Sequence, residues 1–240
     1  MWNLLNEDPT KQIHFQAPFS EKYRLVIDSD IVMGSMEFKT QTECRWDVRL
    51  LAVGKQHYDF ELLTLENVML QTNNPNLRDI ASLNHAFGQM YRELRFTIDR
   101  KGQLLQVNNL AQIGGKWQQT KAEMQELQSK HPSIEGIITL NDEVFASPES
   151  ITKAVGENEF FELYFHQLFG RSLPDTLNAG KKSLFGQNRM VWQYAIQTDP
   201  YPPTRAETLR VSFKGTPLSF GKDWNQKAYG VFPRFAGTGA

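Results

Sequence analysis

The side chains best suited to metal binding in this chain of 240 residues are five histidines. They are His14, His57, His85, His131 and His166. They do not form the close pairs on one face of an element that a zinc site requires. Asp28 and Asp30 flank a serine, but a calcium loop would also need a glycine and a distal glutamate, so these acids indicate a turn. The sequence therefore predicts no metal and no other cofactor.

Nucleophilic or general-base catalysis would rest on Cys44 or on Glu162 and His166. Cys44 is the single cysteine, so no intramolecular disulfide can form. It lies on the apolar side of an alternating run, which favours a buried and inert thiol. Glu162 and His166 are one helical turn apart and could pair as an oriented base, but they are more simply the polar strip of an aromatic helix. No catalytic residue is predicted, and the sequence leans away from an enzyme.

Two short segments resemble anion-binding loops. The segment 179–183 has Gly-Lys-Lys-Ser, yet position 175 is aspartate where a phosphate loop needs its first glycine, and no apolar strand precedes it. Gly114-Gly115-Lys116 could hold an anion at a helix start, although a plain turn into a helix is more common. Neither segment is predicted to be a phosphate site.

Composition and charge limit the range of partners. The chain is 40% hydrophobic and 22% charged with a net charge of -1, which is typical of a soluble globular protein and gives no global attraction to nucleic acid. Its basic residues near the long alternating run, such as Arg45 and Arg49, are interleaved with Glu43 and Asp47. No apolar run approaches the roughly 20 residues of a membrane helix, and residues 1–12 lack the pattern of a secretory signal. We therefore expect no nucleic acid partner, no membrane span and a cytoplasmic location.

The clearest structural signal is strict alternation over Met36–Leu50. One parity is mainly apolar and includes Cys44 and Trp46, whereas the other is charged, so the run predicts a strand with one packed and one wet face. Strands usually span about 3–10 residues. A strand of this length should therefore be bent or bulged, which favours a strongly curved sheet.

Other elements are predicted by shorter patterns. The predicted strands are Tyr23–Asp28, His57–Leu65, a hairpin over Leu94–Val107 that turns at Gly102, Met190–Thr198, and a run from Leu209 to Phe213 that is followed by a turn at Gly215–Pro217. The predicted helices are one that Asn74-Pro75 opens and that runs to Leu94, Lys116–Lys130, a short helix capped by Ser147, and Glu157–Phe169, which ends at Gly170 and is apolar nearly all round. Residues 133–146 are open between strand and helix, and 171–188 are predicted to form a loop.

These elements predict one α+β domain over residues 1–240, with a curved antiparallel β-sheet and several helices packed on one face. Residues 1–20 and 222–240 are predicted to be irregular arms. An alternative is a boundary near residue 131.

Three functions stay open on the sequence alone. The favoured one is a non-enzymatic protein-interaction protein, a subunit or adaptor of a larger assembly or a self-associating chain. It rests on aromatic residues that are typical interface anchors: Phe161, Tyr164 and Phe165 on the aromatic helix, and Trp224, Tyr229 and Phe232 in the tail.

The second function is a carrier of an apolar small molecule in a cavity between sheet and helices. Phe161, Tyr164, Phe165, Trp46 and Trp192 are its candidate wall residues. In shape alone, a curved sheet capped by helices resembles the half-barrels of lipoprotein carriers. The third function is an enzyme whose site is assembled from residues distant in the sequence.

Overall fold

A computed structural model describes residues 14–33, 35–75, 77–78, 88–127, 134–165, 168–182, 189–198 and 210–218. The chain divides into two compact units, of which unit 1 comprises His14–Gly170 and unit 2 includes the residues from Arg171 onward. The division therefore falls after Gly170, and the helices before and after residue 131 belong to the same unit. A single domain over the whole chain stays a prediction.

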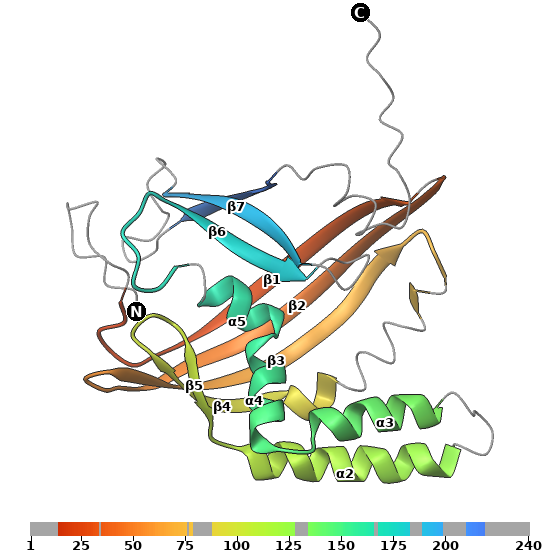
Figure 1. The fold of residues 1–240 in the computed structure, drawn as a ribbon. Coiled ribbons are helices and arrows are strands. Elements are labelled where there is room, and N and C mark those ends of the chain that lie inside the picture. The colour runs from red at the N-terminus through yellow and green to blue at the C-terminus, as the bar shows by residue number, and fades with distance from the viewer. Residues whose placement is uncertain are drawn as a thin grey trace, which may run out of the picture. The chain divides into compact units, whose positions relative to one another are not determined.

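Unit 1 contains an open antiparallel sheet of five strands that neighbour one another in sequence order (Figure 1). The strands are β1 (Phe19–Met33), β2 (Met36–Val53), β3 (His57–Thr72), β4 (Glu93–Asp99) and β5 (Leu104–Val107). The alternation of Met36–Leu50 is confirmed as β2. Three register shifts in the β2–β3 ladder confirm that this strand is bulged.

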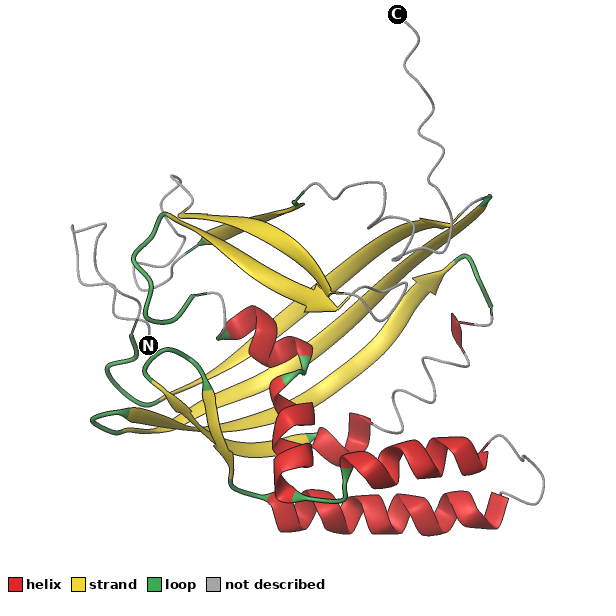
Figure 2. Ribbon diagram, viewed as in Figure 1, coloured by secondary structure: helices red, strands yellow, loops and turns green. Residues whose placement is uncertain are grey.

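The helices of unit 1 gather on one side of this sheet, with α4 and α5 across its face (Figure 2). They are η1 (Gln89–Tyr91, a 3-10 turn), α2 (Leu110–Leu127), α3 (Ile134–Val144), α4 (Pro148–Gly156) and α5 (Glu159–Tyr164). Ser147 caps α4 as predicted, because its side chain accepts a hydrogen bond from the amide of Ser150. The predicted fold class, α+β with an antiparallel sheet, is confirmed.

The core of unit 1 lies between the sheet and α5. The buried face of the sheet is formed by alternating residues of three strands: Cys44, Trp46, Val48, Leu50, Tyr58, Phe60, Leu62, Leu94, Phe96 and Ile98. From α5, Phe161 contacts Phe96 with ring centroids 4.7 Å apart, and Phe160 contacts Trp46 at 5.1 Å. Burial of large rings on both sides supplies the main favourable term for this packing.

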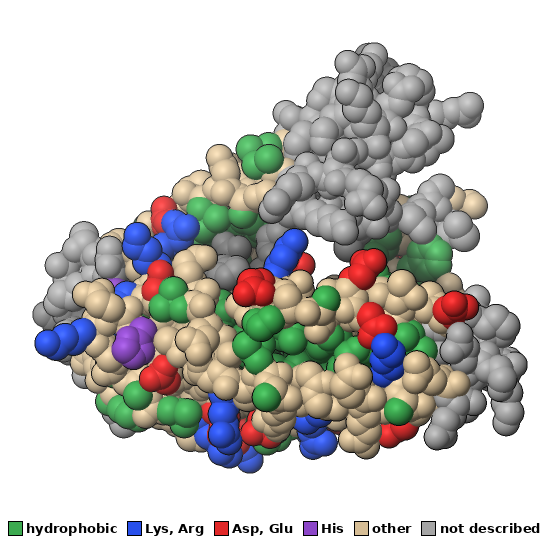
Figure 3. Space-filling model, turned by 60° about the horizontal axis from the view of Figure 1, so that its bottom comes forward, with side chains coloured by type: hydrophobic (Ala, Val, Ile, Leu, Met, Phe, Trp, Pro, Cys, Tyr) green, Lys and Arg blue, Asp and Glu red, His purple; other side chains and the backbone are tan. Residues whose placement is uncertain are grey.

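The opposite face of the sheet is a network of ion pairs. Glu43 accepts hydrogen bonds from Arg24 (Nε to Oε2, 2.8 Å) and from Arg45 (2.6 Å), and the bond from Arg24 above all lowers the pKa of Glu43. Glu61 lies 3.0 Å from both Arg49 and Arg95. Acidic and basic side chains are also interspersed on the face that Figure 3 draws. The arginines that the sequence places on this surface are thus engaged with carboxylates of their own chain.

Several predicted boundaries are wrong, mainly because strand pairing extends past the sequence pattern. β1 runs from 19 to 33 instead of 23 to 28, and its Asp28–Asp30 segment pairs with Lys39–Gln41 instead of turning. β3 likewise continues to Thr72. The predicted helix ending at Leu94 is also too long, since Glu93 already begins β4, while residues 79–87 lie outside the described part of the chain.

Three helical predictions also change. Of the segment 133–146, which the sequence left open between strand and helix, Ile134–Val144 form the helix α3. Helix α2 begins at Leu110, so Gly114 and Gly115 lie inside it, and their amides are not at a helix start. Helix α5 stops at Tyr164, and Phe169 beyond it contacts Phe15 at 4.7 Å instead of continuing the helix. The predicted turn into a helix at Gly114-Gly115 is therefore wrong, and the condition for an anion site at a helix start is not met there.

Unit 2 contains a three-stranded antiparallel sheet of β6 (Asp175–Lys182), β7 (Arg189–Thr198) and β8 (Val211–Pro217). β7 was predicted, but β6 replaces part of an expected loop because its whole length pairs with β7. A turn was expected at Gly215–Pro217, yet these residues pair with β7 as well, and Tyr194 lies against Gly215 where a Cβ would meet its ring at 2.8 Å.

His14 gives unit 1 a specific dependence on pH. Its Nδ1 is buried with no hydrogen-bond partner in the described part of the chain. Burial, and secondly the charge of Arg100, lower the pKa of His14 from its ordinary 6.5. As pH falls through 6.5, the unfolded chain therefore binds a proton that the folded chain does not. The free energy of unfolding should drop until the pH reaches the lowered pKa of the folded state.

We expect His14→Ala to flatten the loss of stability between pH 7 and pH 5.5. The carboxyls with lowered pKa, such as Glu43 and Asp142, act at more acidic pH, because their ordinary values are 4.5 and 3.8. Urea titrations of both proteins at several pH values measure the difference. Equal slopes for wild type and variant over this window would contradict the assignment to His14.

Candidate functional site

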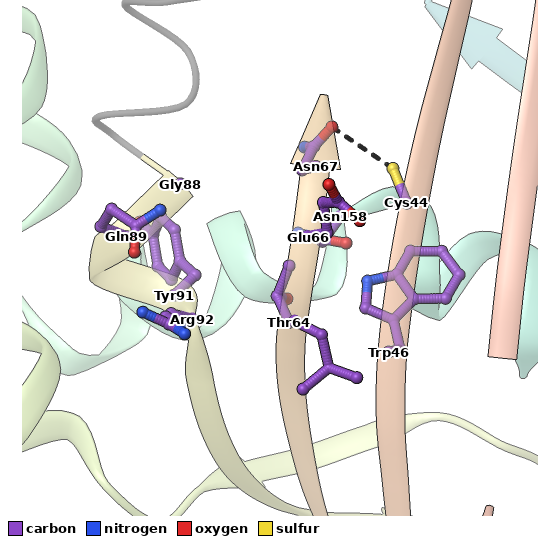
Figure 4. A pocket seen from close by; sticks show the side chains of 11 residues that line it. Cys44, Trp46, Thr64, Glu66, Asn67, Gly88, Gln89, Tyr91, Arg92 and Asn158 are labelled. Carbon is purple, nitrogen blue, oxygen red and sulfur yellow. Dashed lines mark hydrogen bonds between the residues drawn. The ribbon is translucent and has the colours of Figure 1, made fainter. Parts of the chain in front are cut away.

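Unit 1 has a pocket of about 320 Å³ between the buried face of its sheet and the helical layer. One wall comes from β2 and β3, with Cys44, Trp46 and the segment 64–67. The other wall comes from η1 and its two flanking residues, Gly88 and Arg92, and Asn158 closes a third side (Figure 4). The volume is at the small end of the roughly 300–1,000 Å³ that small-molecule sites occupy.

Trp46 is the main apolar group of the sheet wall. Its ring packs edge-on against Phe160 of α5, which fixes its position. In Figure 4 the indole nitrogen lies on the side of the ring that faces β3 and η1. No hydrogen bond joins this nitrogen to any described residue. The pocket therefore has an aromatic surface with an available N–H donor.

Cys44 and Asn67 face each other across β2 and β3. The Cys44 thiol is 2% exposed and donates to Oδ1 of Asn67 over 3.4 Å, which confirms that this cysteine is buried. Its partner is an amide oxygen, which cannot act as a general base at neutral pH. The pair thus serves to hold the strand wall in place.

Tyr91 is positioned by the helical layer behind it. Its ring stacks on Phe145 at 5.8 Å, and Phe145 stacks in turn on Trp117 at 5.3 Å. Trp117 Nε1 donates to Asp142 (3.0 Å), which also accepts from Lys121 (2.6 Å) and thereby joins α2 to α3. Burial raises the pKa of Tyr91 to about 12, so its phenol is neutral at pH 7. The η1 wall therefore rests on a rigid stack of rings.

The side-chain amide of Asn158 is held in place at the start of α5. It is the N-cap of α5, and its Oδ1 accepts a hydrogen bond from the amide of Phe160 at 2.9 Å. Because the oxygen is committed to the cap, the side-chain nitrogen is the group left for other contacts. That nitrogen has no hydrogen-bond partner within the described ranges.

Arg92 and Glu66 are the charged residues of the pocket lining. Glu66 is paired with Arg45 on the ion-paired face of the sheet, at 3.3 Å. Arg92 uses its backbone to bond Gln89 and Thr64, but its guanidinium has no ion pair or hydrogen bond within the part of the chain that the structure describes. The pocket is therefore bordered by a solvent-exposed guanidinium without an ion pair among the described residues, while its carboxylate is paired with Arg45.

The structure places the predicted binding residues of α5 mainly in the core. Phe161 and Phe165 are fully buried, with no exposed surface. Tyr164 is half-buried, and its hydroxyl is 2.8 Å from that of Tyr23. Among the expected cavity wall residues of unit 1, Trp46 alone lines the pocket. The two phenylalanines are therefore part of the core and do not line this pocket.

The other predicted binding residues, Trp224, Tyr229 and Phe232, lie outside the described residues. The same holds for His166, so its proposed pairing with Glu162 stays a prediction. Within the described ranges, no group of three or more His, Cys, Asp or Glu residues could hold a metal ion. The protein-interaction function stays a prediction that rests on the tail.

Sequence reasoning missed Arg92 and Asn158 as pocket residues. Arg92 was assigned to the polar side of a helix that in fact ends before it, and Asn158 to the interior of a helix that it caps. The sequence contains one related signal, because the alternation of apolar residues in β3 breaks at Thr64–Asn67. In the structure this break coincides with a register shift opposite Arg45 and Trp46, next to the pocket.

Comparisons with known proteins do not assign this chain to a family. No family model, no curated protein and no solved structure matches this chain. Within the described residues, none of the helices combines the length and the apolar character needed to cross a membrane.

Proposed function

We propose that the protein is a non-catalytic binding protein that holds a small molecule in the pocket between β2, β3 and η1. The observation that carries this proposal is a cavity of about 320 Å³ with an aromatic wall and side-chain donors that the described chain leaves unused. Ligand sites commonly combine apolar walls with a few directed polar groups. The lining is more polar than the purely apolar cavity expected from the sequence.

Binding is favoured over catalysis by the state of the groups that line the pocket. Glu66 is ion-paired with Arg45, and the Cys44 thiol donates to Asn67. A general base would need a free carboxylate or an imidazole within reach of the substrate, and no histidine is among the pocket residues. The available groups instead suit recognition of a ligand by hydrogen bonds and ring contacts.

Gly88→Phe tests this function directly. Gly88 lines the pocket with φ -59°, a conformation open to any residue, and a Cβ there would meet nothing within 4 Å. A phenyl ring at this position should narrow the pocket without backbone strain. Gly136→Phe, at an exposed position of α3, is the matched control, because a Cβ there also meets nothing within 4 Å.

Native mass spectrometry of protein purified gently from its own cells measures the outcome. We expect wild type and Gly136→Phe to have the same added non-covalent mass above 27.6 kDa, and Gly88→Phe to lose it. Retention of the added mass by Gly88→Phe would place the ligand elsewhere. The proposal would be refuted if all three proteins had the mass of the bare chain and if no small-molecule extract of the cells raised their thermal stability.

A further inference from the structure

The charge state of the pocket indicates the chemistry of its ligand. The arginines Arg24 of β1 and Arg45 and Arg49 of β2 are paired with acids: Arg24 and Arg45 with Glu43, and Arg49 with Asp47 and Glu61. Arg92 instead lines the pocket as an exposed residue and has no such partner among the described residues, so its guanidinium is accessible to a ligand. A guanidinium presents a planar fork of donors that matches a carboxylate.

Two neutral side chains of the pocket, Trp46 and Asn158, can donate hydrogen bonds to a ligand. Trp46 offers an indole N–H and has no acceptor atom. The Asn158 oxygen is occupied by the Phe160 amide, which leaves its NH₂ group. The hydroxyls of Thr64 and Tyr91 also line the pocket and can donate or accept, so a ligand with a charged oxygen pair would find donors on both walls.

The apolar wall residues and the volume of the pocket restrict the size and polarity of the remaining part of the ligand. Trp46 and Leu65 give apolar contact on the sheet side, and Tyr91 gives a second ring on the η1 side. A volume of about 320 Å³ corresponds to roughly ten water molecules at about 30 Å³ each. The space therefore suits a compact organic molecule.

We infer that the pocket binds a small organic carboxylate with an apolar or aromatic body, whose carboxylate is recognised by Arg92, Trp46 Nε1 and the Asn158 amide. This inference rests on the proposed function and specifies its ligand class. Arg92 supplies the charge, and the two neutral donors orient the oxygen atoms. The ring of Trp46 contacts the body of the ligand.

Matched pairs of acids and primary amides test the inference. Benzoate, phenylacetate, indole-3-acetate and hexanoate are each compared with the corresponding amide by ligand-observed NMR and then by calorimetric titration. We expect at least one acid to bind wild type about tenfold or more tightly than its amide, as a hydrogen-bonded charge implies. Gly88→Phe should abolish binding of both members of that pair.

Arg92→Gln should remove the preference for the acid while leaving amide affinity within about twofold. Lys55→Gln, at the exposed β2–β3 turn, removes the same charge away from the pocket and should leave the preference intact. Trp46→Phe keeps a ring but loses the N–H donor, so it should weaken acid binding by several-fold.

The failures of the two proposals can be told apart. Equal affinity for acids and amides, blocked by Gly88→Phe, would overturn the carboxylate assignment and leave the binding function in place. Binding of inorganic phosphate with none of the acids would likewise overturn it. Binding of neither acids nor amides would also overturn it, and the native mass of the Gly88→Phe protein would decide separately whether the pocket holds a ligand.

Discussion

Phe96→Ala should cost unit 1 about 3–5 kcal/mol of unfolding free energy, a large part of the stability of an ordinary domain. Phe96 is fully buried on β4 and stacks on Phe60, with centroids 5.5 Å apart and planes 7° apart. It also contacts Phe161 at 4.7 Å and Phe165 at 5.9 Å. Truncation would thus open a cavity where the sheet meets α5.

Urea denaturation followed by circular dichroism measures this loss. Leu105→Ala on the neighbouring strand β5 is the control, since Leu105 is 56% exposed and its truncation should cost about 1 kcal/mol or less. Phe96 and Phe161 share one contact, so the double variant should lose less than the sum of the two single variants. Strict additivity, or a loss for Phe96→Ala no larger than for Leu105→Ala, would contradict this description of the core.

The sequence predicted the parts of the fold in which one local pattern determines the structure. Alternation between Met36 and Leu50 was enough to predict β2 and the side on which Trp46 and Cys44 are buried, because a strand exposes every second residue to the same face. The hairpin turn at Gly102 was predictable for a similar reason, and its φ of +78° confirms it.

The sequence could not show where pairing with another strand extends an element. Asp28–Asp30 has turn-forming residues, yet β2 offers it backbone partners, and Gln41 donates to Asp28 over 2.8 Å. β6 has no apolar alternation that separates it from a loop, and it forms because β7 lies beside it. Tertiary pairing overrides local preference in both places.

The pocket was less predictable than the fold. Its candidate binding groups are side-chain donors that have no hydrogen-bond or ion-pair partner among the described residues, and a sequence pattern does not show which side chains lack a partner. Trp46 could be named from its position on the dry face of β2. Nothing in the sequence distinguishes Arg92, whose guanidinium lacks an acid, from Arg95, which is 3.0 Å from Glu61. That difference depends on strand register between β3 and β4, which no short pattern encodes.

Gly102→Ala should destabilise unit 1 by about 2–4 kcal/mol for two separate reasons. At φ +78° an L side chain is strained, which costs about 1–2 kcal/mol. A Cβ at this position would also lie 3.0 Å from the carbonyl oxygen of Phe165 and 3.1 Å from its Cβ. Phe165 is the C-cap of α5, so the hairpin turn would press on the end of the helix that Asn158 caps at its start.

Two glycine variants separate these contributions in thermal and urea unfolding. Gly170→Ala has φ +69°, but its Cβ would come no closer than 3.4 Å to Lys101, so it should show the backbone cost of about 1–2 kcal/mol alone. Gly115→Ala lies inside α2 with nothing within 4 Å and should stabilise the helix by up to about 1 kcal/mol. If Gly102→Ala lowered the free energy of unfolding by no more than Gly170→Ala does, the close contact with Phe165 would make no contribution to the loss of stability. If it costs more, the displaced α5 should also shift Asn158, and binding in the pocket should weaken in this variant but not in Gly170→Ala.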